Sequence, residues 1–309
     1  MSAVPPPALP VVELGQVPAG LLTELTDAGL DVEALWRHLT LALLEDVPPG
    51  TEDTTSAATI TDDARAAGAF VARESGVVSG LGVAALVFHA VMGDTVDVTD
   101  RLPDGSRVSA GDVVMRVSGP ARGLLTAERT ALNFASHLSG VSTATARWVE
   151  ALEGTGAKVL DTRKTLPGWR DLQKYAVRTG GGVNHRFGLH DMAMVKDNHV
   201  VAAGGVVPAL EAVRRAYPGL PVEVEVQDLD ELRQVLEAGA ERILLDNMST
   251  ADMAEAVRVT DGRAVLEASG GLTIDRAREV GETGVDFLSV GALTHSVTVF
   301  DLGLDLDEE

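Results

Sequence analysis

The second half of the chain alternates between short apolar runs and amphipathic stretches at a regular interval. From about Val222 onward, four runs rich in Val, Ile and Leu recur roughly every 22 residues. Helical patterns fill the intervals, and each begins after an N-cap candidate, namely Asp228, Ser249 or Thr273. Short strands that alternate with helices indicate βαβ units and a parallel sheet. The four runs are VEVEV (222–226), RILLDN (242–247), AVLEASG (264–270) and DFLSVG (286–291).

Two earlier segments fit the same scheme and bring the number of expected strands to six. These are AKVLDTRKT (157–165) and MAMVKDNHV (192–200). Six parallel strands are compatible with a (β/α) barrel and with an open, doubly wound sheet, and the pattern leaves both possible.

The first 135 residues have a different pattern. A helical stretch around 21–44 precedes alternating runs at 67–80 and 94–121, which contain Asp-Gly and Ala-Gly turn signals. This predicts an α+β layer, and a long helical segment at 124–154 leads into the second half, so we expect the domain boundary near residue 135. The proline-rich residues 1–20 are expected to form a mobile arm, and the tail at 295–309 is a candidate to return to the first domain.

Composition and charge exclude several classes of protein. The 309 residues include 25 Lys and Arg against 46 Asp and Glu, and this net charge of −21 argues against a broad nucleic-acid or anionic-membrane surface. The lack of cysteine excludes disulfides, thiol nucleophiles and cysteine-ligated metals. No apolar run is long enough to span a membrane and the N-terminus lacks signal-peptide features, so we expect a cytoplasmic protein that binds neither nucleic acid nor membrane.

One segment departs from this acidic background. Residues 161–199 contain seven Lys and Arg against four Asp and Glu, whereas the rest of the chain contains 18 against 42. All four lysines of the chain, Lys158, Lys164, Lys174 and Lys196, lie in or next to this segment. A compact ammonium group and a planar guanidinium differ in the ligands they suit, so the cluster predicts a local anion site.

The expected strands end in polar residues. In a parallel barrel the carboxyl ends of the strands face one shared cleft. A single polar strand end is usually a rim ion pair, but six in succession predict a binding cleft with cations from the early strands and carboxylates from the late ones. In chain order the ends are Arg163 and Lys164, Lys196 and Asp197, Glu225, Asp246, Glu267 to Ser269, and Ser289 to Gly291.

Three glycine-containing segments add to this cleft. SGGLT (269–273) and VGALTHS (290–296) each precede a possible helix start, where backbone N–H groups can bind a phosphate. RTGGGVNHRFGLHD (178–191) brings His185 and Arg186. A metal site formed by His185, His190 and His199 with Asp191 and Asp197 is disfavoured because no metal-binding motif occurs.

The residue types predict the ligands. Grouped Arg, His and Lys suit a small carboxylate, since a guanidinium binds a carboxylate bidentately. Glu225 and Asp246 near a phosphate suit Mg²⁺, sugar hydroxyls, or both. The cleft is therefore expected to hold one phosphate and one or two carboxylates.

Several motifs resemble those of the quinolinate phosphoribosyltransferase family, the carboxylating nicotinate-nucleotide pyrophosphorylases of de novo NAD biosynthesis. The resemblance covers nearly the whole chain. Its most specific part is DTRKTLPGWRDLQKYAVRTGGGVNHR (161–186), and the others include ERTALNFASHLSGVST (128–143), MVKDNH (194–199), VEVEV (222–226), LLDN (244–247), EASGG (267–271) and SVGALTHS (289–296).

The resemblance implies an N-terminal α/β sandwich domain at 21–134 and a C-terminal, incomplete TIM-like (β/α) barrel at 135–294. It also implies Mg²⁺ as cofactor, quinolinate and phosphoribosyl pyrophosphate as substrates, and a homodimer, or a higher oligomer, whose active site is completed across the subunit interface. The products would be nicotinate mononucleotide, pyrophosphate and CO₂.

Carried over position by position, the resemblance assigns three groups of residues. Lys164, Glu225 and Asp246 are expected to be catalytic, and the last two are expected to hold Mg²⁺ and the ribose hydroxyls. The carboxylates of quinolinate are expected to be bound by Arg129 of the neighbouring subunit, Arg163, Lys164, His185, Arg186 and Lys196, and Thr162 is expected to be a further substrate-binding residue. The 5′-phosphate is expected to be bound by Ser269, Gly270, Gly271, Val290, Gly291 and Ala292.

Three rival functions are left open by the sequence. One is a related phosphoribosyltransferase that acts on another acid, such as nicotinate. Another is a Schiff-base aldolase that uses Lys164 or Lys196, and the third is a phosphosugar-binding protein without catalysis.

Overall fold

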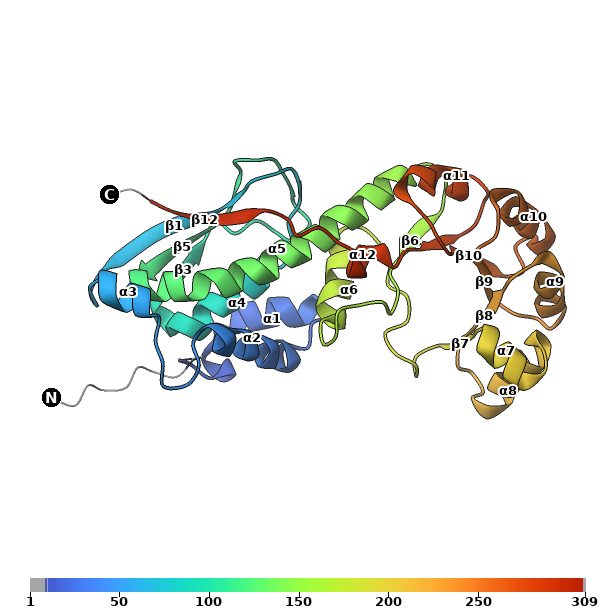
Figure 1. The fold of residues 1–309 in the computed structure, drawn as a ribbon, viewed down its shortest axis with the longest axis horizontal. Coiled ribbons are helices and arrows are strands. Elements are labelled where there is room, and N and C mark those ends of the chain that lie inside the picture. Colours follow the sequence, from blue (N-terminus) through green and yellow to red (C-terminus); the bar gives the residue numbers. More distant parts are fainter. Residues whose placement is uncertain (1–8, 10, 308–309) are drawn as a thin grey trace. The chain divides into compact units, whose positions relative to one another are not determined.

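The computed structural model describes residues 9 and 11–307, which divide into two compact units (Figure 1). The first unit contains residues up to Thr143, 171–180 and those from Val297 on, and the second contains 144–170 and 181–296. The chain first passes between them inside the long helix α5 (Ala121–Ala151), the same segment in which the boundary was expected. Of the arm expected at 1–20, residues 1–8 and 10 lie outside the described residues. The remainder contains the 3₁₀ turn η1 (Leu14–Gln16) and the start of helix α1 at Ala19.

The first unit is a layer of helices on an antiparallel sheet with the strand order β12-β1-β5-β3. Buried Phe70 of β1 contacts Phe88 of the apolar helix α4 edge to face, at 5.8 Å between ring centroids. β12 comes from the end of the chain and pairs with β1, so the C-terminal residues belong to this sheet. The strands are β1 (Arg65–Ala72), β3 (Asp97–Thr99), β5 (Val113–Pro120) and β12 (Leu302–Leu306), with a separate pair β2 (Gly76–Val77) and β4 (Arg107–Val108).

The helical stretch expected at 21–44 is interrupted. Gly29 follows α1 with a φ of +80°, a conformation that ends a helix and that glycine adopts without strain. Asp31 then caps the next helix by accepting from Ala34 N at 2.9 Å. The helices of this unit are α1 (Ala19–Asp27), α2 (Val32–Asp46), α3 (Thr54–Thr59), α4 (Leu81–Met92), the turn η2 (Gly93–Thr95), the first part of α5, and α6 (Arg170–Thr179) from its second residue on.

The second unit contains the six expected strands as one parallel sheet, in the order β6-β11-β10-β9-β8-β7. Strands β7 to β11 are neighbours in chain order without a reversal, which is the winding of a barrel and not that of a doubly wound sheet. Among the described residues β6 pairs with β11 and not with β7, so the barrel is open there. The predicted two-domain fold with an incomplete barrel is confirmed. The strands are β6 (Lys158–Leu160), β7 (Ala193–Val195), β8 (Val222–Val226), β9 (Arg242–Asp246), β10 (Val265–Ser269) and β11 (Phe287–Ser289).

Helices cover the outer side of these strands (Figure 1). Asp228 and Ser249 cap α9 and α10 as expected, because their side chains accept from backbone N–H groups two or three residues ahead. The segment after Thr273 begins as a 3₁₀ turn, η3, before α11. The elements are α7 (Asp197–Ala203), α8 (Val206–Ala216), α9 (Leu229–Glu237), α10 (Thr250–Thr260), η3 (Ile274–Arg276), α11 (Ala277–Gly281) and α12 (Ala292–His295).

The strand register arranges the interior of the barrel in layers. Side chains alternate along each strand, so every second residue points inward. Glu223 lies beside Arg242, and the next layer up contains Glu225, Leu244 and Glu267. Asp246 and Ser269 follow at the ends of their strands. Parallel barrels usually fill this space with Val, Ile and Leu, whereas charged residues occupy much of it here. Within the described part of the chain, no helix combines the length and apolarity that crossing a membrane requires.

Candidate active site

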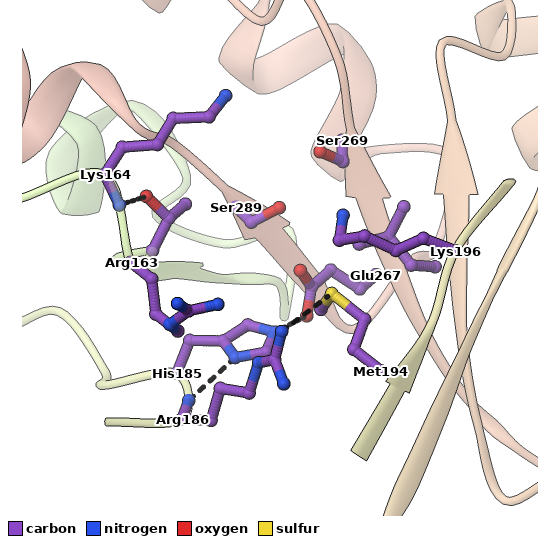
Figure 2. A pocket seen from close by; sticks show the side chains of 11 residues that line it. Arg163, Lys164, His185, Arg186, Met194, Lys196, Glu267, Ser269 and Ser289 are labelled. Carbon is purple, nitrogen blue, oxygen red and sulfur yellow. Dashed lines mark hydrogen bonds and ion pairs between the residues drawn. The ribbon is translucent and has the colours of Figure 1, made fainter. Parts of the chain in front are cut away.

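A cavity of about 320 Å³ opens at the carboxyl ends of the parallel strands (Figure 2). Seven residues predicted to bind the substrates line it, and so do Glu267 and Ser289 from the predicted polar strand ends and two further residues. The seven are Thr162, Arg163, Lys164, His185, Arg186, Lys196 and Ser269, and the two further residues are Met194 and Leu244. The volume suits a small ligand, and the lining combines five groups that carry or can carry positive charge with a few apolar side chains.

The loop after β6 is fixed by hydrogen bonds on both sides. The backbone N–H of Lys164 donates to Thr162 Oγ1 at 3.0 Å, and Thr294 Oγ1 donates to the carbonyl oxygen of Lys164 at 2.7 Å. Arg163 Nε is buried and has no hydrogen-bond partner among the described residues. A guanidinium with a free buried donor is ready to bind an acceptor on a ligand.

A buried carboxylate positions the second group of cations. Asp161 lies fully buried after β6, and its oxygens accept from Asn184 Nδ2 at 2.5 Å and from the backbone N–H of His185 at 2.9 Å. The same loop carries Arg186, whose Nη1 donates to the carbonyl oxygen of Met192 at 3.0 Å. Burial, and after it the charge of Arg163, lower the pKa of Arg186. Like charges are therefore close together, and an anion between them would be stabilised.

Lys196 and the two predicted acidic residues form the opposite side of the rim. Lys196 Nζ lies 2.8 Å from Glu225 Oε2, and the Glu225 side chain is only 11% exposed. Asp246 ends the neighbouring strand, and its Oδ2 accepts from Asn247 Nδ2 at 2.9 Å. Neither carboxylate lines the cavity, although Lys196 and Ser269 beside them do. The structure thus places both acids at the edge of the pocket.

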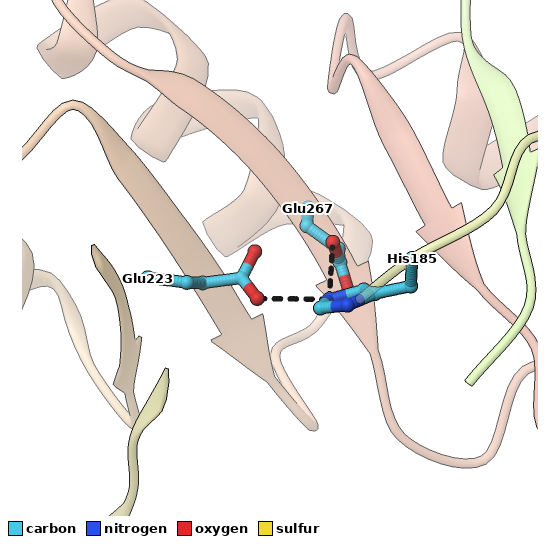
Figure 3. Close-up of side chains that lie close together, drawn as sticks. All are labelled: His185, Glu223 and Glu267. Carbon is cyan, nitrogen blue, oxygen red and sulfur yellow. Dashed lines mark hydrogen bonds and ion pairs between the residues drawn. The ribbon is translucent and has the colours of Figure 1, made fainter. Parts of the chain in front are cut away.

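Two residues of the pocket lining, His185 and Glu267, interact with the buried Glu223 (Figure 3) and with Arg242. We call these four side chains the buried charge cluster. His185 Nε2 lies 2.9 Å from Glu223 Oε2 and 3.4 Å from Glu267 Oε2. Arg242 donates to the same two carboxylates, from Nε at 2.9 Å and from Nη2 at 3.1 Å. Both glutamates are fully buried.

The cluster shifts the protonation of its members. Burial acts against the charged imidazole, but the hydrogen bonds and charges of Glu223 and Glu267 outweigh it and raise the pKa of His185 to about 9. The other ring nitrogen opposes this rise, since Nδ1 accepts from the backbone N–H of Arg186 at 2.7 Å and must lack a proton to do so. Because Nε2 lies beside the carboxylate oxygens of Glu223 and Glu267, it carries a proton both when the ring is neutral and when it is charged.

His185, Glu223 and Glu267 bring three ligand-type atoms within 4.8 Å of one another. Arg242 already binds both carboxylates and supplies the positive charge that a metal ion would supply. The cluster is therefore better described as an ion-pair network than as a metal centre. It shares His185, but no other residue, with the histidine and aspartate set that the sequence disfavoured as a metal site.

The two glycine-rich turns follow the strands whose last residues, Ser269 and Ser289, line the cavity. Gly270 has a φ of +96°, and a Cβ there would lie 2.2 Å from Asn247 Oδ1. At Gly291 a Cβ would lie 2.9 Å from Lys164 Cδ. Gly271, Val290 and Ala292 complete the turns but do not line the cavity. At Gly270 the positive φ and the lack of space both require glycine, whereas a Cβ at Gly291 would meet the Lys164 side chain, which can move.

Arg129 is the one predicted residue outside the second unit. It lies in α5, its side chain is 65% exposed, and Nη2 lies 3.9 Å from Glu128 Oε1. It does not line the cavity. Its expected role depends on a second subunit and stays a prediction.

The sequence contained a signal for the residues that were missed. In VEVEV the two glutamates share one face of the strand, so a Glu225 that points to the cleft requires a Glu223 that points the same way one layer below. The same alternation relates Arg242 to Asp246, and Glu267 to Ser269. A parallel strand is covered on both faces, so an inward charge at Glu223 requires a partner.

Comparisons with known proteins agree with this arrangement. Residues 53–139 match the family model of the quinolinate phosphoribosyl transferase N-terminal domain, and residues 141–305 match that of the C-terminal domain. The carboxylating nicotinate-nucleotide pyrophosphorylase of Mycobacterium leprae (strain TN) is 53% identical over 269 residues, which cover 86% of this chain and 94% of the relative. A chloroplastic relative of that name from Oryza sativa subsp. japonica is 42% identical, over 88% of this chain and 77% of its own. The solved nicotinate-nucleotide pyrophosphorylase of Francisella tularensis superposes with a TM-score of 0.86 at 37% identity, over 90% of this chain and 98% of that one.

Proposed function

We propose, because this chain belongs to the quinolinate phosphoribosyl transferase family, that it converts quinolinate and phosphoribosyl pyrophosphate into nicotinate mononucleotide, pyrophosphate and CO₂. This reaction would serve de novo NAD biosynthesis. The relatives from Mycobacterium leprae and Oryza sativa are named after this activity, and the matches cover most of the length of each.

The observation that supports this proposal most strongly is the set of cations around one cavity. Arg163, Lys164, Arg186 and Lys196 converge with His185 on a space the size of a small aromatic acid. Each carboxylate can take two of these side chains as partners, so the set suits a dicarboxylate better than a monocarboxylate such as nicotinate. Met194 and Leu244 line the same cavity and offer apolar contact to a ring.

The residues of this chain would act mainly by orientation and charge. The four cations fix the carboxylates and so aim the ring nitrogen at C1 of the sugar, which replaces its bond to pyrophosphate by a bond to nitrogen. Positive charge develops on the sugar in this displacement, and the carboxylates of Glu225 and Asp246 at the rim would stabilise it. Lys164 follows β6 next to the turn after β11, and its ammonium there would favour departure of the anionic pyrophosphate.

The second step removes the 2-carboxylate as CO₂. The electron pair of the broken bond remains at ring C2, next to the positively charged nitrogen, and C2 then takes up a proton. The partly enclosed pocket holds the ring in place while this occurs. No covalent intermediate with a side chain is needed.

A Mg²⁺ ion would fit the acidic side of the rim. Glu225 and Asp246 end adjacent strands and offer oxygen ligands, and Mg²⁺ is commonly held by one or two carboxylates together with substrate phosphates. When bound, it would neutralise charge on the pyrophosphate. We propose that these two residues hold it, with Glu225 exchanging its contact with Lys196, and that the turns at Ser269–Gly271 and Val290–Ala292 bind the 5′-phosphate.

Incubation of the purified protein with quinolinate, phosphoribosyl pyrophosphate and Mg²⁺ tests this function. Nicotinate mononucleotide and CO₂ should form in equal amounts. Turnover of nicotinate in place of quinolinate would favour a related phosphoribosyltransferase. Trapping of a carbonyl substrate on Lys164 or Lys196 by borohydride would favour an aldolase, and binding of phosphoribosyl pyrophosphate without release of pyrophosphate would favour a binding protein.

A further inference from the structure

Glu223 is a buried acid that does not line the pocket but contacts His185, which does, and Arg242 on the neighbouring strand. It is fully buried in the middle of β8 and does not line the pocket. One oxygen accepts from Arg242 Nε at 2.9 Å, and the other lies 2.9 Å from His185 Nε2. Burying a carboxylate is costly unless it is paired, so a residue that serves only packing would be apolar here.

Both nitrogens of the His185 ring take part in hydrogen bonds, one with the cluster and one with the backbone. Nε2 lies 2.9 Å from Glu223 Oε2 and 3.4 Å from Glu267 Oε2, and because carboxylate oxygens accept hydrogen bonds, Nε2 carries a proton and donates a hydrogen bond to Glu223. Nδ1 accepts from the backbone N–H of Arg186 at 2.7 Å. The ring thereby connects the interior of the barrel to the main chain of a residue whose guanidinium lines the pocket.

Arg242 makes this connection stable. Its guanidinium binds both glutamates and lies over the Phe287 ring at 5.1 Å. Two adjacent carboxylates without this cation would repel each other, and one would become protonated or turn away. The cluster connects Arg242 through Glu223 and Glu267 to His185, which lines the pocket, and Figure 3 shows the last three of these side chains.

We infer that Glu223 and Arg242 are positioning residues for the carboxylate-binding side of the pocket, and that they act through the hydrogen bond from His185 Nε2. Neither residue lines the cavity, so neither contacts the ligand. In this role His185 orients Arg186 by accepting its backbone N–H, and both ring nitrogens are engaged within the protein. The inference rests on the proposed function insofar as the ligand to be positioned is quinolinate.

Two variants of Glu223 separate hydrogen bonding from packing. Glu223→Leu keeps the volume and removes both acceptors, whereas Glu223→Gln has one acceptor oxygen and can satisfy His185 or Arg242 but not both. We expect Glu223→Leu to raise the Kd of quinolinate about tenfold or more and Glu223→Gln to raise it about threefold, in line with the loss of groups that orient binding residues. The Kd of phosphoribosyl pyrophosphate should change less than about twofold, since its expected sites lie at the rim.

Calorimetric titration of each ligand measures these changes, and Glu211→Gln serves as the control. Glu211 is an acid of α8 that makes only a surface pair with Arg215, with 57% of its side chain exposed. This variant should bind both ligands as the wild type does. If Glu223→Leu does not fold, Glu223→Gln and the next measurement decide the question.

The ¹⁵N NMR spectrum of the histidine rings in the ligand-free wild type provides a test that does not depend on substrate. His185 is assigned by the signal that Glu223→Gln shifts and that His185→Gln removes. A protonated Nε2 supports the inference, and an unprotonated Nε2 overturns it. Wild-type affinity for quinolinate in Glu223→Leu would also overturn it, while the proposed function would stand. Failure of the wild type to bind quinolinate would overturn both.

Discussion

The side chains around the cavity differ in how well their hydrogen-bonding groups are satisfied without a ligand, and Arg163 is the clearest case of an unsatisfied group. Its Nε is a buried donor without a partner in the described part of the chain, and Arg186 nearby carries a like charge. Both features favour an anion at this point. Removal of Arg163 would leave a substrate carboxylate enclosed and unpaired.

We therefore predict that Arg163→Ala weakens quinolinate binding by about 2–5 kcal/mol, the usual cost of removing one partner of a buried charge pair. Calorimetry with quinolinate measures the change. Arg215→Ala provides the control, because this arginine makes only an exposed pair with Glu211. Unchanged affinity in Arg163→Ala would remove this residue from the carboxylate site.

Secondary structure was well predicted from sequence because each element carries its own local signal. The strand VEVEV begins and ends as expected, the strand expected at 242–247 ends one residue earlier, at Asp246, and Asp228 and Ser249 cap the helices as their positions indicated. The pattern of strands and helices alone could not distinguish the open barrel from a doubly wound sheet, since strand order depends on contacts between distant segments. The family resemblance implied the barrel. Glu223 and Arg242 were missed because the site was predicted from residues at strand ends, and these two residues lie in the layer beneath.

The turn after β10 allows a prediction about an element. Gly270 has a φ of +96° and a Cβ would lie 2.2 Å from Asn247 Oδ1, whereas Gly239 has a φ of +72° and open space around it. Gly239→Ala should lower the free energy of unfolding by about 1 kcal/mol, because only the strain of a positive φ in a non-glycine residue is added. Gly270→Ala should cost about 2 kcal/mol or more, because the adjacent strand end must also move.

Urea denaturation measures both free energies of unfolding, and steady-state kinetics measures the KM of phosphoribosyl pyrophosphate. The KM should rise in Gly270→Ala alone, because this turn is the expected phosphate site and the turn at Gly239 lies outside it. Equal KM values in the two variants would argue against phosphate binding at 269–271.

The whole molecule combines a strongly negative charge with one cationic pocket. Net charge argues against a broad nucleic-acid or anionic-membrane surface, but only the fold brings the cations of the early strands together with the acids of the late strands. The expected role of Arg129 concerns the assembly of two subunits. Sequence resemblance assigned this residue to a neighbouring subunit, and its exposed side chain in α5 is available for such a contact.

If Arg129 completes the pocket of a partner in a homodimer, two inactive variants should restore activity when mixed. In a dimer of Arg129→Ala and Arg163→Ala subunits, one pocket combines an intact Arg163 with an intact Arg129 of the other subunit, while the second pocket lacks both. Random reassociation gives half of the dimers this composition, so refolding an equal mixture should recover about a quarter of wild-type activity. Separately refolded variants are the control. If the mixture stays at the mean of the two parents, each pocket uses only residues of its own chain, and the shared active site is wrong.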